Sequence, residues 1–141
     1  MTNICYYCCK SKLIPARNYS AVLKIARKIF NQNQLNVRRR PYIRSAYFAG
    51  EKIFLDNFWT HLMQKDISDR IRRMRFIDVA FELIKKSHFD PIAEKYDKIN
   101  KREILYRFLG EIDGISFIVQ IKEDLKRKQK FFMSVLEYTK K

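Results

Sequence analysis

The dipeptide Asp113-Gly114 lies between two runs of alternating apolar residues, and it constrains the fold more than any other feature. Glycine tolerates the positive φ of a two-residue type I′ turn, so this pair predicts a β-hairpin. Its first strand starts after Arg102 and its second covers residues 115–122. A charged turn then leads to a third strand over residues 130–138. The chain is therefore expected to end in an antiparallel sheet of at least three strands.

The same turn predicts which side chains share a face of this sheet, because residues pair by counting outward from it. Ile112 pairs with Ile115 in this register, and Arg107 pairs with Gln120. We expect an apolar face, packed on helices, to carry Ile104, Tyr106, Phe108, Ile112, Ile115, Phe117, Val119, Ile121, Phe131, Met133 and Val135. We expect a concave, solvent-facing side to carry Leu105, Arg107, Gln120, Lys122, Lys130, Phe132, Ser134, Leu136 and Tyr138.

The residues before the sheet have the apolar spacing of amphipathic helices. Three segments are expected to be helical: 20–32, 51–65 and 66–87. Ser20 can cap the first helix, and Asp66 or Ser68 can cap the last. The polar residues 88–101 are expected to form a loop. The predicted fold class is α+β, with N-terminal helices packed on a small twisted antiparallel β-sheet.

A basic connector, Arg38-Arg39-Arg40-Pro41, divides the chain. Pro41 disfavours a helical conformation at Arg40, so a helix is not expected to continue through the connector. We expect residues 1–37 to form a helical extension and residues 38–141 to form the α+β domain.

Charge and hydropathy narrow the class of protein. A chain of 141 residues with 47% hydrophobic residues can bury one domain core. The 30 lysines and arginines exceed the 15 acidic residues, and the net charge of +15 favours polyanionic partners.

No run approaches about 18 apolar residues, so no membrane span is expected. Residues 1–12 lack the pattern of a secretory signal, and a cytoplasmic protein is expected.

Three cysteines, Cys5, Cys8 and Cys9, lie in the first ten residues. Cys5 and Cys8 have the spacing of zinc ligands, but a structural zinc site normally has four ligands. His61 or His88 could complete such a site only by distant folding. The alternative is a set of free thiols in a reducing compartment. We expect no metal.

The solvent-facing side of the sheet suits an RNA phosphodiester. Arginine offers a bidentate fork to phosphate oxygens and lysine offers a point charge. Aromatic side chains nearby can stack on unpaired bases. The alternative is a polar face without chemistry, because antiparallel sheets commonly expose one polar side.

The order and spacing of several segments carry a resemblance to a known superfamily. They are FWTHL at 58–62 with Lys65, 70–87 followed by FDP at 89–91, Arg107-Phe108, VQIKED at 119–124 and FFMSV at 131–135. Together they resemble the phage and mobile-element branch of the barnase, EndoU, colicin and RelE-like (BECR) ribonucleases. The resemblance covers residues 38–138.

This resemblance implies a metal-independent, toxin-like endoribonuclease without a cofactor. Such enzymes cleave RNA by attack of the ribose 2′-hydroxyl, which leaves a 2′,3′-cyclic phosphate. His61 is the expected general base or acid, because imidazole titrates near neutral pH. The other expected catalytic residues are Arg107, Lys122, Ser134 and Tyr138. The expected substrate-binding residues are Lys65, Arg70, Arg73, Gln120, Arg39 and Arg40.

The expected partners are RNA, such as tRNA or mRNA, and an acidic antitoxin or immunity protein. Two other functions fit the same sequence. One is a non-catalytic RNA- or DNA-binding protein of mobile-element origin. The other is a protein-interaction module in which the apolar N-terminal helix docks a partner.

Overall fold

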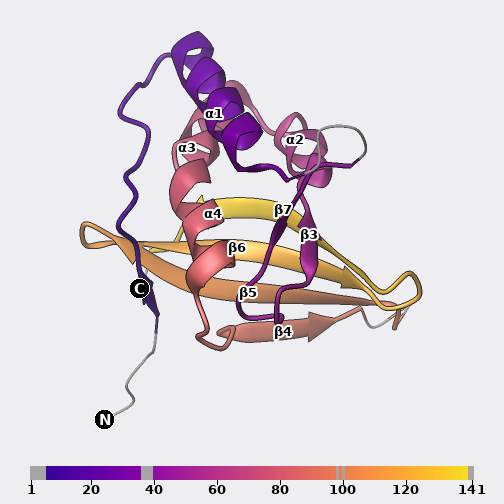
Figure 1. Cartoon of the computed structure of the whole chain (residues 1–141). Helices are drawn as coiled ribbons and strands as arrows, with labels where there is room; N and C mark the ends of the chain where they lie inside the picture. The colour runs from indigo at the N-terminus through magenta and orange to yellow at the C-terminus, as the bar shows by residue number, and fades with distance from the viewer. Residues whose placement is uncertain (1–5, 36–39, 98, 100, 140–141) are drawn as a thin grey trace.

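The computed structural model describes residues 6–35, 40–97, 99 and 101–139. Short strands and helices come first, and three long strands end the chain (Figure 1). The elements in chain order are β1 (Tyr7–Cys8), α1 (Tyr19–Asn33), β2 (Tyr42–Arg44), β3 (Lys52–Phe54), α2 (Asp56–Leu62), α3 (Ile67–Met74), α4 (Ile77–Lys86), β4 (Ala93–Tyr96), β5 (Glu103–Ile112), β6 (Ile115–Asp124) and β7 (Gln129–Glu137). The α+β class predicted from the sequence is confirmed.

The strands form one curled, mixed sheet in the order β1-β5-β6-β7-β3-β2, with β4 also pairing with β5 (Figure 1). The pairs β4–β5, β5–β6, β6–β7 and β2–β3 are antiparallel, whereas β1 joins β5 and β3 joins β7 in parallel. The prediction of a small antiparallel sheet was too narrow. The four additional strands have only two to four residues each, which is too short for apolar alternation to reveal them.

The predicted hairpin is confirmed. Asp113 and Gly114 have φ values of 49° and 79°, as a type I′ turn requires. Ile112 lies opposite Ile115, and Arg107 lies opposite Gln120. The polar and apolar sides of β5 and β6 follow from this register.

A β-bulge at Met133 changes the phase of β7. Ser134 lies opposite Gln120, but Phe132, two residues earlier, lies opposite the next residue of β6, Ile121. The prediction that Phe131 and Met133 face the core, and that Phe132 and Lys130 face solvent, was therefore wrong. Phe132 is fully buried on the helix side. Phe131 lies opposite Lys122 and Lys130 lies opposite Glu123, each on the side opposite to the prediction.

The helices differ from the sequence expectation in three places. The first helix begins after Asn18, whose side chain accepts a hydrogen bond from the Ala21 amide. The expected helix 51–65 starts instead as β3, because residues 52–54 pair with β2 and β7. The expected helix 66–87 is divided into α3 and α4 at Arg75 and Phe76.

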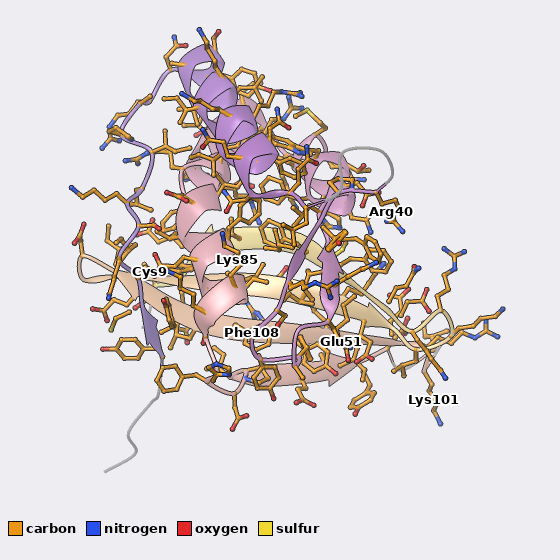
Figure 2. All side chains as sticks on the ribbon, viewed as in Figure 1. Cys9, Arg40, Glu51, Lys85, Lys101 and Phe108 are labelled. Carbon is orange, nitrogen blue, oxygen red and sulfur yellow. The ribbon has the colours of Figure 1, made fainter. Side chains whose placement is uncertain are left out.

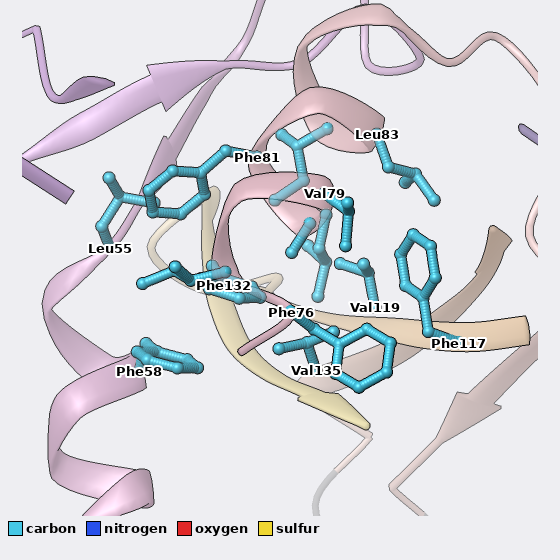
Figure 3. Packing of buried hydrophobic residues seen from close by; sticks show 14 of the residues in the cluster. Leu55, Phe58, Phe76, Val79, Phe81, Leu83, Phe117, Val119, Phe132 and Val135 are labelled. Carbon is cyan, nitrogen blue, oxygen red and sulfur yellow. The ribbon is translucent and has the colours of Figure 1, made fainter. Parts of the chain in front are cut away.

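One hydrophobic core joins the helices to the sheet. Helix α4 crosses one face of β5, β6 and β7 and buries Phe81 against Phe132 (Figures 1 and 3). Helix α1 adds Val22, Ala26 and Phe30 to the same cluster. The residues before β2 thus share their core with the rest of the chain, and a domain boundary at residue 37 stays a prediction.

The segment before α1 is fastened to α4 by Glu82. The buried Glu82 carboxylate accepts hydrogen bonds from the backbone amides of Lys10 and Ser11, at 2.6–3.1 Å. Burial alone would raise the pKa of Glu82. Hydrogen bonds from Ser11, Lys10 and Tyr7 outweigh burial and lower this pKa to about 2.

Candidate functional site

Helix α2 holds His61 at the β7 edge of the three long strands. Phe58 and Leu62 of this helix are buried, and the Phe58 ring stacks on Phe132 of β7 with centroids 4.8 Å apart. His61 remains partly exposed between these two anchors. It lines a shallow hollow with Phe58, Leu62, Lys65, Arg73, Met133 and Ser134.

Arg73 of α3 reaches across this hollow to the sheet. Its Nη1 donates a hydrogen bond to Ser134 Oγ at 2.6 Å, and its Nε donates to Asp69 Oδ1 at 3.1 Å. The Arg73 side chain is only 18% exposed. The bulge at Met133 places Ser134 on this side of the sheet, and the i, i+4 carboxylate of Asp69 fixes the arginine.

Lys122 brings a further cation to the same side of the sheet. It lies opposite Leu105 and Phe131 in the two neighbouring strands. Its ammonium lies 5.6 Å from the centre of the Phe131 ring and 3.9 Å from the Glu103 carboxylate. This last distance is at the limit of an ion pair, so Lys122 keeps most of its capacity to bind an anion.

The surroundings of His61 favour its neutral form. Burial lowers the pKa of His61 below its ordinary value of 6.5, and the positive charges of Lys65, Lys122 and Arg73 lower it further. A neutral imidazole at neutral pH can accept a proton. Cations around a proton acceptor are the arrangement needed for chemistry on a phosphate ester.

A row of polar side chains extends from the hollow across the sheet. Ser134, Gln120 and Arg107 lie opposite one another on β7, β6 and β5. Adjacent strands are about 4.8 Å apart, so Arg107 is about 10 Å from Ser134. Among the side chains that the structure describes, Arg107 Nε is buried and has no hydrogen-bond partner. An unpartnered buried donor of this kind can bind an anionic ligand.

The remaining residues predicted for the site lie in different surroundings. Lys65 follows the end of α2, in a turn, and still lines the hollow. Arg70 donates to the backbone carbonyls of Lys65 and Met63, both at 2.8 Å, so most of its donors hold this turn. Tyr138 follows β7 and bonds through its amide to Ser116.

The register separates Tyr138 from the hollow. Tyr138 is four residues from Ser134 along the strand direction, which corresponds to about 13 Å of extended chain, and it does not line the hollow. The structure therefore brings His61, Lys65, Arg73 and Ser134 around the hollow and places Lys122 close enough to affect His61 electrostatically. The row of polar residues continues from Ser134 through Gln120 to Arg107, and Tyr138 does not line the hollow.

The basic connector is described only from Arg40, and Arg38 and Arg39 lie outside the described residues. The Arg40 guanidinium pairs with Asp56 at 3.0–3.1 Å and stacks on the rings of Phe54 and Phe131. It projects beside the start of α2 (Figure 2). Arg40 and Lys122 thus lie over the same Phe131 ring.

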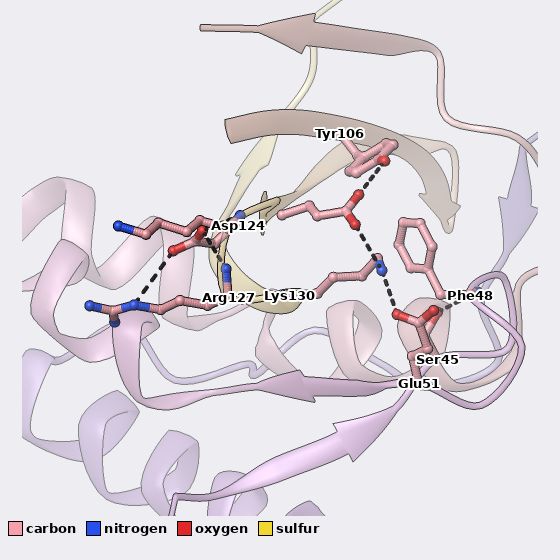
Figure 4. Close-up of polar contacts among 9 residues, drawn as sticks. Ser45, Phe48, Glu51, Tyr106, Asp124, Arg127 and Lys130 are labelled. Carbon is pink, nitrogen blue, oxygen red and sulfur yellow. Dashed lines mark hydrogen bonds and ion pairs between the residues drawn. The ribbon is translucent and has the colours of Figure 1, made fainter. Parts of the chain in front are cut away.

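Sequence reasoning missed a second charged cluster, on the helix side of the sheet (Figure 4). Lys130 pairs with Glu123 at 3.3 Å and with Glu51, and Tyr106 donates to Glu123 at 2.7 Å. This cluster borders an open hollow of about 610 Å³. The bulge brings Lys130 to this side, so simple alternation along β7 could not reveal it.

The two cysteines that the structure describes, Cys8 and Cys9, do not line this hollow. Cys8 and Cys9 are free, and Cys9 Sγ lies 3.6 Å from the carbonyl of Val79. Burial, followed by the charge of Glu82, raises the pKa of Cys9 to about 12. Cys5 lies outside the described residues. Within the described ranges, no three histidine, cysteine or acidic side chains are placed to hold a metal ion.

Comparisons with protein-family models, curated proteins and solved structures give no significant match to this chain. No helix in the described part of the chain has the length and apolarity needed to cross a bilayer. The geometry of the hollow beside α2 is therefore the basis for a functional proposal.

Proposed function

We propose that this protein is a metal-independent endoribonuclease that cleaves RNA by attack of a ribose 2′-hydroxyl on the adjacent phosphorus. The observation that carries the proposal is the grouping of His61 with Lys65 and Arg73 around one hollow, with Lys122 close enough for its charge to lower the pKa of His61. Residues from α2, α3 and β7 meet there. The resemblance of the sequence to the BECR ribonucleases suggested the same reaction.

His61 acts as the general base. Its lowered pKa keeps the imidazole neutral near pH 7, so it can accept the proton of the 2′-hydroxyl. The oxygen then bonds to phosphorus, the bond to the 5′-oxygen breaks, and a 2′,3′-cyclic phosphate forms. A lysine ammonium, Lys65 or Lys122, donates the proton that the leaving 5′-oxygen requires.

Fixed cations stabilise the negative charge that develops on the phosphorane. Arg73 is held by Asp69 and Ser134 before substrate arrives, so little reorganisation is needed. Arg107, whose buried Nε has no partner among the described residues, contributes its positive charge from the third strand of the row. Gln120 lies between them and can orient the ribose or a phosphate oxygen.

The deciding experiment is cleavage of total RNA and purified tRNA in the presence of EDTA. Wild type is compared with His61→Ala, with Arg107→Ala and with a matched exposed variant, Lys86→Ala. We expect discrete products ending in a 2′,3′-cyclic phosphate, a loss of at least about 100-fold in either site variant, and no loss in Lys86→Ala. Intact RNA that still shifts in a gel would reject the enzyme in favour of a non-catalytic RNA-binding protein.

The identity of the general acid can be resolved with a modified substrate. An RNA with a bridging 5′-sulfur has a leaving group that needs no proton. The variant that lacks the true acid should recover cleavage of this substrate, whereas a variant that lacks only a charge-stabilising residue should not. Lys65→Ala and Lys122→Ala form the matched pair.

An acidic antitoxin or immunity protein would act by covering these cations. We expect such an inhibitor to compete with RNA for Lys65, Lys122 and Arg107. Co-expression that relieves the toxicity of the wild-type protein, without altering its abundance, is the measurement that supports this partner.

A further inference from the structure

The positive charge of the chain is distributed unevenly. The first 50 residues contain ten lysines and arginines and no aspartate or glutamate. The remaining residues contain 20 basic and 15 acidic side chains. Solvated helix faces usually mix charges of both signs. A segment that has only cations therefore calls for an anionic partner.

Helix α1 presents three of these cations on one exposed face. Lys24, Arg27 and Lys28 have the i, i+3, i+4 spacing that places side chains together on a helix, and all three are exposed. The opposite face is buried in the core through residues 22, 26 and 30. None of the three cations pairs with a carboxylate in the part of the chain that the structure describes.

This face adjoins the proposed cleavage site. The Arg27 guanidinium lies 5.2 Å from the centre of the Trp59 ring, on the helix that carries His61. At the start of α1, the Tyr19 hydroxyl accepts a hydrogen bond from Arg70, which also holds the turn containing Lys65. Helices α1 and α2 accordingly lie at the same end of the molecule (Figure 1).

We propose that the exposed face of α1 binds the phosphates of the RNA strand beyond the bond that is cleaved. This inference rests on the proposed function and specifies its substrate: an RNA strand long enough to reach both α1 and the hollow. The 15 residues of α1 span about 22 Å. A mononucleotide or dinucleotide bound over the shallow hollow is too short to reach α1 and gains nothing from it.

The test compares substrate length in two triple variants of equal charge. One is Lys24→Gln, Arg27→Gln, Lys28→Gln on α1, and the control is Lys52→Gln, Lys86→Gln, Lys126→Gln at exposed positions elsewhere. Glutamine retains helix propensity, and circular dichroism checks the fold. For a 30-nucleotide RNA, we expect the α1 variant to raise KM at least about tenfold with unchanged kcat. For a tetranucleotide, we expect unchanged kcat/KM.

Binding provides a measurement that does not depend on turnover. In the His61→Ala background, fluorescence anisotropy of a labelled 30-nucleotide RNA gives affinity as a function of salt. Three fewer phosphate contacts should reduce the slope of log K against log salt by about 2 for a single strand. The control triple should reduce it by clearly less than the α1 triple.

Three outcomes would overturn this inference. One is an equal loss in both triple variants, which would reflect net charge alone. Another is an unchanged salt slope in the α1 variant. The third is α1-dependent binding to phosphatidylserine vesicles without α1-dependent binding to RNA, which would make a membrane surface the partner. If wild type cleaves no RNA but the slopes differ as expected, the proposed enzyme fails and the α1 surface stands.

Discussion

The two sides of the β6–β7 pair use their charges in opposite ways. On the helix side, Lys130 is only 8% exposed and is paired with both Glu123 and Glu51, while Tyr106 binds Glu123 (Figure 4). On the other side, the nearest carboxylate to Lys122 lies at 3.9 Å. On the same side of the sheet, Arg107 of the adjacent strand β5 keeps a buried nitrogen without a partner among the described residues.

This difference distinguishes charged side chains that stabilise the fold from charged side chains that remain available to bind a ligand. A buried cation between two carboxylates has its charge compensated, and removing it leaves uncompensated partners. A cation without such compensation contributes little to folding but strongly attracts an anion. The same two strands therefore carry a structural cluster on one side and the proposed catalytic row on the other.

The largest expected effect comes from the proposed catalytic side. Lys122→Ala should lower kcat/KM for RNA cleavage by about 10²–10³, because one stabilising donor to the transition state is lost. Its thermal midpoint should match that of wild type. A midpoint several degrees lower with full activity would make Lys122 a structural residue and would remove the contrast between the two sides.

Lys130→Met should show the reverse pattern. It should reduce the free energy of unfolding by about 3 kcal/mol, mainly because Glu123 is left buried without its cation. Glu51 is 55% exposed and can turn to water, so it adds little to this loss.

Urea unfolding measures the effect of Lys130→Met, and adding Glu123→Gln should recover part of the loss. Activity per folded molecule should stay near the wild-type value. A stable Lys130→Met variant that has lost activity would place the catalytic centre on the helix side instead.

Substitutions at two neighbouring residues of β5, Gly110→Ala and Leu109→Ala, compare how tightly the two sides of the sheet are packed. A Cβ at Gly110 would meet the Phe117 ring at 2.5 Å and Leu83 at 2.8 Å. We expect a loss of about 1–3 kcal/mol from overpacking. Leu109 faces the other, more open side, so Leu109→Ala should give a smaller loss in the same urea titration. Equal losses would show that both sides are packed alike.

The smallest expected effect is a shift in pH dependence. The acid limb of kcat/KM should lie below pH 6.5, because burial and the neighbouring cations lower the pKa of His61. Lys65→Gln removes one of these cations, so the pKa should rise and the limb should move to higher pH. A limb that stays in place would show that Lys65 is too far away to act on the imidazole.

The lowered pKa of His61 also affects stability. The folded protein binds fewer protons at His61 than the unfolded chain does, so this residue lowers the free energy of unfolding as the pH falls below 6.5. His61→Gln should remove this contribution in urea titrations at two pH values.

Local rules predicted the long strands better than the short elements. The Asp113-Gly114 turn set the β5–β6 register and placed Arg107 opposite Gln120. Strands of two to four residues carry no usable periodicity, so β3 was taken as part of a helix and β4 as part of a loop. The short strands β1 and β4 pair with the long strand β5, β3 pairs with the long strand β7, and β2 pairs with β3.

The sequence named several residues that line or neighbour the hollow, but it did not predict the contacts between them. The resemblance named His61, Lys122 and Ser134, and the fold places them around or beside one hollow. The link between Arg73 and Ser134 joins residues 61 positions apart, and no local pattern encodes it. The sequence predicted Arg70 and Arg73 alike as substrate-binding residues. In the structure, Arg70 instead donates hydrogen bonds to backbone carbonyls.

Because of the bulge at Met133, the number of residues in β7 determines which side of the sheet its side chains face, as much as their type does. Phe132 before it is buried against the helices, and Ser134 after it lies on the opposite side of the sheet. Met133 itself is only partly buried, so replacing its side chain leaves both neighbours in position. Deleting it would force the chain either to expose Phe132 or to bury Ser134 away from Arg73. Sequences that share this site should therefore tolerate many residues at position 133 but no gap there.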